Sequence, residues 1–396
     1  MTVTRKSLAA AGCALLIAAS TACGSAAPAD AESRARRAVE KLGEWETVTV
    51  TTALDASAGD IRAFARHGLP VPGLPVPGLA GTGTAAGPVD APLLSRVETV
   101  LTIGADGPLK DVREAEHVDS ALMVNLGGKD LAGYKAIGDG FYVRVNWDRL
   151  APELDWRDDT VNRGAELAAA ADGLPSSLAA ARDLFRGRWV RVDPREFERF
   201  ATVAGVRYGE AATRLADEAE LLLSARAQHR VLESVREVLD EHAVFRDGGR
   251  RDGADRVTVA LPAREAVRDL TAALAPLEGD FGGIGAWSGL LDDVPEKGRI
   301  TLELELRGGV LSGLTVDLGQ FAAGGPDGAQ GERGARGTGK LPLTLTFAPG
   351  QAVRVDTPPA AKRLEPQDVV GAVLYTELAE RRTERQDTEE PGKPVP

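Results

Sequence analysis

Cysteine is nearly absent from this sequence. Its 396 residues include only Cys13 and Cys23, both close to the amino terminus. No disulfide can therefore crosslink the rest of the chain, and no thiolate cluster can hold a structural zinc ion. Histidine is also scarce, and no two of the four histidines stand at a metal-ligand spacing. We therefore expect no metal and no other cofactor.

Aromatic residues and positive charge are also in short supply. Aromatics make up 5% of the chain, so the core must be built mainly from Val, Leu and Ala. Lys and Arg number 47 against 59 Asp and Glu, which gives a net charge of -12 and a pI near 5.1. Nucleic acids require a basic surface, so we expect no nucleic-acid partner. The same balance excludes adhesion to anionic lipid headgroups by charge alone.

Catalytic signatures are missing as well. There is no Gly-x-Ser-x-Gly elbow and no phosphate loop, and the glycine-rich stretch 282–285 lacks the strand-then-helix setting of a dinucleotide site. The run 117–120 contains the residue types of a catalytic triad, but adjacent strand residues point to opposite faces. The triplet 240–242, Asp-Glu-His, is a candidate metal cluster, and a solvated helix end is the favoured interpretation. We expect no enzyme, and an unrecognised hydrolase is the least favoured hypothesis.

The first residues have the pattern of an export signal. Arg5 and Lys6 precede an apolar run over residues 8–19, and small residues follow. This run is shorter than the roughly 20 apolar residues that span a membrane. The sequence therefore predicts a secretory signal peptide over residues 1–22.

Cys23 stands directly after this signal. An exported chain with one thiol at its new amino terminus resembles a bacterial lipoprotein, whose lipobox usually reads Leu-(Ala/Ser/Thr)-(Gly/Ala)-Cys, with Ser20 here in place of Leu. We predict a lipid on Cys23 and a flexible tether over residues 23–32. The chain would then be anchored at the outer, extracytoplasmic face of the cell membrane. The alternative is cleavage by the ordinary signal peptidase near Ala22, without a lipid.

Alternation of apolar and polar residues predicts many strands in the exported part. In the run 46–54, valines lie on one face and threonines on the other, which indicates a half-buried strand. The run 300–306 alternates throughout and turns at Gly308 and Gly309. The predicted strands cover residues 46–54, 97–103, 121–126, 133–137, 141–147, 188–193, 256–261, 300–306, 310–318, 341–347 and 352–355.

Helical spacing of apolar residues appears between these strands. The predicted helices cover residues 33–42, 194–204, 208–240, 264–277 and 369–378. A charged, glycine-rich turn is expected over 247–252. The segment 381–396 is charged and proline-rich, and we predict it to be disordered.

Two repetitive stretches have both a structural and a functional interpretation. Residues 68–88 contain a tandem Gly-Leu-Pro-Val-Pro repeat, which favours an extended connector over an interaction motif. Residues 325–337 keep glycine at every third position, as collagen does. A flexible loop is favoured there over a trimerising stalk, because the stretch is short and lies between two strands.

The order of these parts and three short phrases resemble a known family. The phrases are Tyr-Lys-Ala-Ile-Gly-Asp-Gly-Phe-Tyr-Val-Arg-Val at 134–145, Gly-Arg-Trp-Val-Arg-Val-Asp at 187–193, and Leu-Thr-Leu-Thr-Phe at 343–347 with Val353 and the prolines 358–359. They are similar to the LppX/LprG-type lipoproteins, which share the architecture of the LolA and LolB carriers. This chain is longer than typical members and adds the proline-rich loop and an extended helical middle.

The resemblance implies an α+β fold with a strongly curved antiparallel sheet, a half-barrel whose concave side is covered by helices. We expect one such domain over residues 33–360 with a helical segment at 194–245 acting as a lid, followed by a short helix and a disordered tail over 361–396. The cavity under the helices would bind a lipid or an acylated molecule for transport to the cell envelope, and the protein would be a monomer. The predicted cavity residues are Phe141, Val143, Val145, Trp147, Trp189, Leu302, Leu304 and Leu345.

An alternative has the same fold with a filled core. The aromatic residues 141, 147 and 189 would then serve ordinary packing. Such a protein would be a structural or adaptor lipoprotein that acts through its proline-rich loop or acidic tail. The sequence leaves both hypotheses open.

Overall fold

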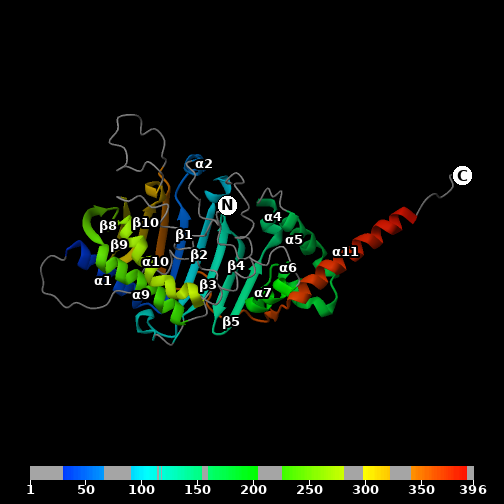
Figure 1. Cartoon of the computed structure of the whole chain (residues 1–396). Helices are drawn as coiled ribbons and strands as arrows, with labels where there is room; N and C mark the ends of the chain where they lie inside the picture. Colours follow the sequence, from blue (N-terminus) through cyan, green and yellow to red (C-terminus); the bar gives the residue numbers. More distant parts are fainter. Residues whose placement is uncertain are drawn as a thin grey trace.

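The structure is a computed structural model of the chain. It describes residues 30–66, 91–113, 116, 118–153, 159–203, 225–280, 298–321 and 340–389. In these residues twelve strands join one sheet, and helices pack against it (Figure 1). The predicted α+β class is confirmed.

Ten of the twelve strands overlap runs that the alternation predicted, and β7 and β12 do not. Their bounds are β1 Thr47–Leu54, β2 Val97–Gly104, β3 Asp119–Leu126, β4 Lys129–Ile137, β5 Gly140–Val145, β6 Val190–Val192, β7 Val244–Arg251, β8 Ala254–Pro262, β9 Arg299–Arg307, β10 Val310–Asp317, β11 Pro342–Pro349 and β12 Lys362–Arg363.

The helices lie before, between and after these strands. Their bounds are α1 Ala31–Gly43, α2 Ala58–Arg66, α3 Ala91–Leu94, α4 Trp147–Glu153, α5 Asp159–Ala170, α6 Ala179–Phe185, α7 Pro194–Val203, α9 Ala225–His242, α10 Ala263–Asp280 and α11 Pro366–Glu389. Short 3-10 turns cover Leu109–Asp111, Ala171–Gly173, Ser176–Leu178 and Leu318–Phe321.

The sheet is large, open and mostly antiparallel. Its strand order is β12-β6-β5-β4-β3-β2-β1-β11-β10-β9-β8-β7, and only the pair β12–β6 is parallel. The amino-terminal strand β1 lies in the middle because it pairs with both β2 and β11. The structure does not show the strong curvature that we expected of a half-barrel.

One face of the sheet is apolar and carries the helices; we call it the helix face. Cross-strand neighbours on it include Val50, Leu101, Leu122, Tyr134 and Val143, which follow one another over β1 to β5. Cross-strand pairs of this kind stabilise a sheet when helices also cover them. Helix α1 covers the part near β7–β10 by burying Ala35, Ala38 and Leu42 in the same core cluster. The core therefore lies between the helix face and the helices.

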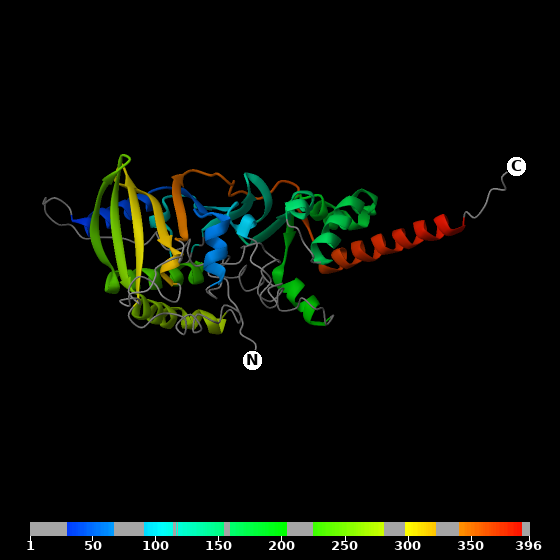
Figure 2. The ribbon, with the colours of Figure 1, turned by 90° about the horizontal axis from the view of Figure 1, so that it is seen from above.

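The helices contact this face near its two ends and, through α2 and α3, at Leu54 in its middle. At one end α5, α6 and α11 pack on β5 and β6, where Phe141, Val190 and Val192 are buried. At the other end α9 and α10 pack on β8, where Leu261 is buried. Figure 2 shows α9 and α10 together on one side of the sheet, and α11 projecting away from the body.

The opposite, polar face of the sheet is crossed by the segment 350–361. The Thr49 hydroxyl donates to the Gly350 carbonyl oxygen at 2.7 Å and accepts from the Ala352 N–H at 3.1 Å. Lys135, only 5% exposed, donates to the carbonyl and the carboxylate of Asp356, both at 3.1 Å. These bonds hold the segment on the sheet until it pairs with β6.

This segment corrects one predicted strand. Residues 352–355 lie outside the sheet, because their N–H groups bond to side chains; that of Val353, for example, donates to the Thr102 hydroxyl at 3.2 Å. A second correction concerns residues 247–252. They were expected to form a turn, but most of them belong to β7, and the turn is made by Asp252 and Gly253, both with positive φ.

The carboxyl-terminal helix is much longer than predicted. We expected a helix over 369–378 and disorder from 381 onward, whereas α11 has 24 residues and continues to Glu389. The residues from 381 to 389 are mostly Arg, Glu and Gln, which are good helix formers, and their polarity alone does not imply disorder.

Candidate functional site

Six of the predicted cavity residues lie on the helix face. Leu304 and Leu345 are both cross-strand neighbours of Leu314, so β9, β10 and β11 bring them together. Leu302 stands two residues from Leu304 on the same side of β9. Phe141, Val143 and Val145 share this face but lie on β5, which is separated from β11 by four strands in the sheet order. The structure therefore divides the predicted set into two groups on one face.

The two tryptophans of the predicted set lie elsewhere. Trp147 was expected at the end of the β5 strand but begins α4, where it packs with Val145 on the cluster of Leu93, Leu126, Leu131 and Leu150. Its ring packs closely on Gly164 of α5. A Cβ atom added to Gly164 would lie 2.3 Å from the Trp147 ring. Trp189 lies on the polar face, with the Lys135 and Arg144 cations 5.3 and 5.0 Å from its ring. Trp189 directly precedes β6 and lies on the side of Arg191, so the structure does not bring it together with the six residues on the helix face.

A row of half-buried aliphatic side chains crosses the helix face. Val316 of β10 is paired with Leu302 of β9 and with Leu343 of β11, and Leu343 is paired with Leu54 of β1. Val97 of β2 continues the row, and all five are only partly buried. We call these five residues the half-buried row. Aliphatic side chains that remain partly exposed on the core face of a sheet offer contact area to an apolar ligand.

Burial on the helix face increases away from this row. The cross-strand neighbours Phe347, Val50 and Leu101 lie further along β11, β1 and β2, and with Leu122 of the adjacent β3 they are 2–7% exposed. Between them and the half-buried row stand Thr52 and Thr99, which are paired with each other. The Thr52 Oγ1 atom is buried and, within the part of the chain that the structure describes, has no hydrogen-bond partner.

Thr49 and Thr52 of β1 provide a matched test of the two faces. Thr49→Val removes a hydroxyl that bonds to Thr102, Gly350 and Ala352, so we expect the free energy of unfolding to fall by about 1–3 kcal/mol. Thr52→Val removes an unpartnered hydroxyl, so stability should stay the same or rise by up to about 1 kcal/mol. Urea unfolding of both variants checks this, and equal losses would contradict the assignment of the two faces.

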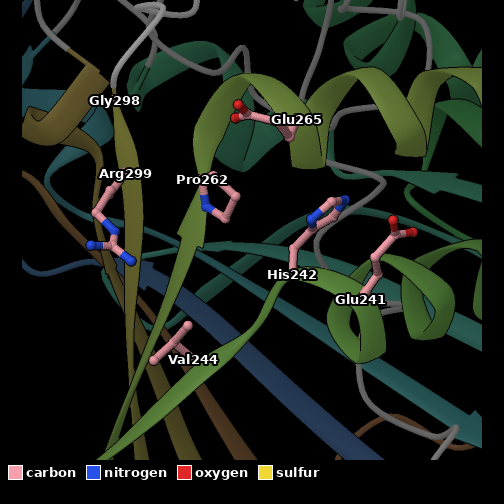
Figure 3. Close-up of a pocket in the computed structure, with 7 residues that line it drawn as sticks. All are labelled: Glu241, His242, Val244, Pro262, Glu265, Gly298 and Arg299. Carbon is pink, nitrogen blue, oxygen red and sulfur yellow. The ribbon is translucent and has the colours of Figure 1, made fainter.

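A polar pocket lies at the far end of the sheet, where α9 leads into β7. It has a volume of about 510 Å³. Figure 3 shows Glu241 and His242 at the end of α9, Glu265 on α10 and Arg299 on β9 around this pocket. The remaining lining residues are Val244, Pro262 and Gly298.

The triplet 240–242 was expected to be a solvated helix end. In the structure its residues contact different partners. Asp240 turns toward Arg36 of α1 and forms an ion pair with it at 2.5 Å. His242 instead has its Nε2 atom 2.7 Å from Oδ2 of Asp269 on α10. Arg268, and then His242, hold the pKa of the Asp269 carboxyl below its ordinary value by hydrogen bonding to it. Sequence reasoning missed Asp269 because it lies 27 residues beyond His242.

Several predictions fall outside the described residues. These are the signal peptide with Cys23, the proline-rich loop, the collagen-like stretch, the glycine-rich stretch 282–285 and the first half of the helix predicted over 208–240. The second half of that helix is confirmed as part of α9. Within the described part of the chain, every helix is too short or too polar to cross a lipid bilayer.

Comparisons with known proteins give a similarity in structure and none in sequence. No protein-family model matches the sequence, and no curated protein matches it. The structure is similar to the crystal structure of the lipoprotein LppX of Mycobacterium tuberculosis, with 12% sequence identity and a TM-score of 0.32. The match covers 82% of this chain and 96% of the LppX chain. It falls in the family that the sequence phrases resemble, but at this level of similarity it supports no conclusion about a ligand.

Proposed function

We propose that this protein binds a lipid or an acylated molecule against the helix face of its sheet, at the outer surface of a membrane. The single observation that carries the proposal is the half-buried row, Leu302, Val316, Leu343, Leu54 and Val97. A hydrocarbon chain laid along this row would remove apolar surface from water on five adjacent strands. Each methylene buried in this way contributes about 0.8 kcal/mol, and no catalytic group is required.

The arrangement of the helices is consistent with this role. They contact the helix face most closely near β4–β6 and near β7–β10. Three members of the row, Leu343, Leu54 and Val97, lie on the strands between these ends, where α2 and α3 pack beside Leu54. In this proposal the ligand lies between the two helical groups, and α7 and α9 belong to the lid. Leu304 and Leu345 would form the floor next to the row, and the half-buried Val143 and Val145 the far wall, whereas Phe141 packs in the core cluster with α5, α6 and α11.

A titration tests the proposal directly. A fluorescent long-chain fatty acid is added to the purified protein, and bound probe is then displaced with unlabelled fatty acid. We expect saturable binding with displacement, since an apolar site shields the fluorophore from water. Fluorescence that rises without saturation, or that resists displacement, would argue against a site.

Attachment to the membrane is a separate part of the proposal and depends on Cys23. We expect the Cys23→Ser variant to lose its lipid and to move from the detergent phase to the aqueous phase in a phase-partition assay of cells that express it. The Cys13→Ser variant is the control, since that residue lies inside the predicted signal peptide. Equal partition of both variants with the unaltered protein would exclude the lipid anchor on Cys23.

An adaptor function remains the second candidate, because α11 has an exposed apolar side. Val370, Leu374 and Leu378 recur at four-residue spacing on this helix and are 40%, 54% and 56% exposed. Such a stripe on a projecting helix favours contact with another macromolecule. The two candidates differ in the titration, because the adaptor with a filled core gives no saturable fatty-acid binding.

A further inference from the structure

Two chain segments far from the half-buried row bring three metal-binding side chains together. Glu241 and His242 end α9, and Asp269 lies in the second turn of α10. Their ligand atoms all lie within 4.8 Å of one another. Glu241 is exposed, while His242 and Asp269 are half-buried, so the cluster opens toward solvent on one side. This combination of one imidazole and two carboxylates differs from an ordinary acidic surface.

We propose that Glu241, His242 and Asp269 bind a divalent transition-metal ion such as Zn²⁺. Zinc takes imidazole nitrogen and carboxylate oxygen at about 2.0–2.2 Å, which places ligands about 3.3 Å apart in a tetrahedral site. The cluster needs only side-chain rotations to reach this spacing. The Glu241 carboxylate moves closer to the other two ligands, and the His242–Asp269 contact opens from 2.7 Å. Ca²⁺ and Mg²⁺ are poorer occupants because they prefer oxygen ligands throughout.

The surroundings supply the rest of a coordination sphere. Glu241 and His242 both line the pocket of about 510 Å³, which has room for a water molecule as the fourth ligand (Figure 3). Glu265 lines the same pocket and adds a third carboxylate near the ion. On the other side, Arg268 donates to both carboxylate oxygens of Asp269, at 2.7 and 3.2 Å. Such outer hydrogen bonds fix the orientation of a ligating carboxylate.

A bound ion would link the end of α9 to α10. These two helices pack on each other and, through Val238 and Ala266, on Leu261 of β8. The ion would therefore stabilise the helix pair at the β7–β9 end of the sheet. This inference is independent of the proposed lipid site, which uses other residues.

The test is isothermal titration of ZnCl2 into the full chain carrying Cys13→Ser and Cys23→Ser, which removes both thiols. We expect one ion per chain, and at least about tenfold weaker binding in the His242→Gln and Glu241→Gln variants. His229→Gln is the matched control, because His229 lies on the same helix and bonds instead to the Arg113 carbonyl oxygen. It should bind zinc as tightly as the parent protein.

The Glu241→Gln variant also distinguishes the loss of a metal ligand from misfolding. Glu241 is exposed, so its substitution should leave the circular dichroism spectrum and the melting temperature of the metal-free protein unchanged. Absence of zinc binding to the parent protein, or equal affinity in the parent and in both ligand variants, would overturn the metal site. Either result would leave fatty-acid binding unaffected.

Discussion

Replacing Val316 with phenylalanine is expected to weaken fatty-acid binding at least about tenfold while leaving the fold stable. Val316 is only partly buried in the half-buried row, so a larger ring can extend into the space that the ligand would occupy. The ring would displace two or more methylene groups of the ligand, each contributing about 0.8 kcal/mol. Displacement titration gives the change in Kd, and urea unfolding gives the change in stability.

Val257 provides the matched control for this substitution. It lies on the same face, on β8, but is 0% exposed. Val257→Phe forces a ring into a filled part of the core, which should lower the free energy of unfolding by about 1–3 kcal/mol. If Val316→Phe destabilises the protein as much as Val257→Phe does, then the space above the half-buried row is filled by the chain itself, and the adaptor hypothesis gains support.

Phe141→Ala should cause a large loss of stability. Phe141 is 2% exposed, lies in the cluster formed with α5, α6 and α11, and stacks on Tyr134 with ring centroids 5.6 Å apart. Truncation of a buried phenylalanine costs about 3–5 kcal/mol through lost burial and the cavity that remains. Thermal or urea unfolding measures this loss directly.

Phe141→Leu separates packing from a specific role of the ring. It keeps most of the apolar volume, so its cost should stay below about 1.5 kcal/mol. A loss as large as that of alanine would show that the stacking on Tyr134 carries most of the effect. A loss below about 1 kcal/mol for Phe141→Ala would contradict the assignment of Phe141 to the core.

Local sequence patterns were sufficient to predict most of the strands. The alternation in 46–54 and 300–306 fixes which side chains share a face, and the structure uses both runs as β1 and β9. The same rule places Leu302, Leu304 and Leu345 on one face, because it depends only on residues within each strand. Burial confirms this placement for Leu304 and Leu345.

Long-range placement could not be predicted in this way. Trp189 was grouped with the cavity by its aromatic character, although its position in the alternation puts it with Lys135 and Arg144 on the polar face. Asp269 belongs to another helix, so no spacing in the sequence joins it to His242. The strand order, with β11 paired to β1, likewise depends on contacts between residues about 300 positions apart.

The most direct measurement for the lipid-binding proposal is native mass spectrometry of the protein purified without added lipid from cells that express it, with Cys23 replaced by serine so that no covalent lipid is counted. The proposal predicts a second species heavier by the mass of one acyl-containing molecule, which organic extraction removes and which is depleted in Val316→Phe. A single species with the mass of the polypeptide alone, together with no saturable fatty-acid binding, would contradict it.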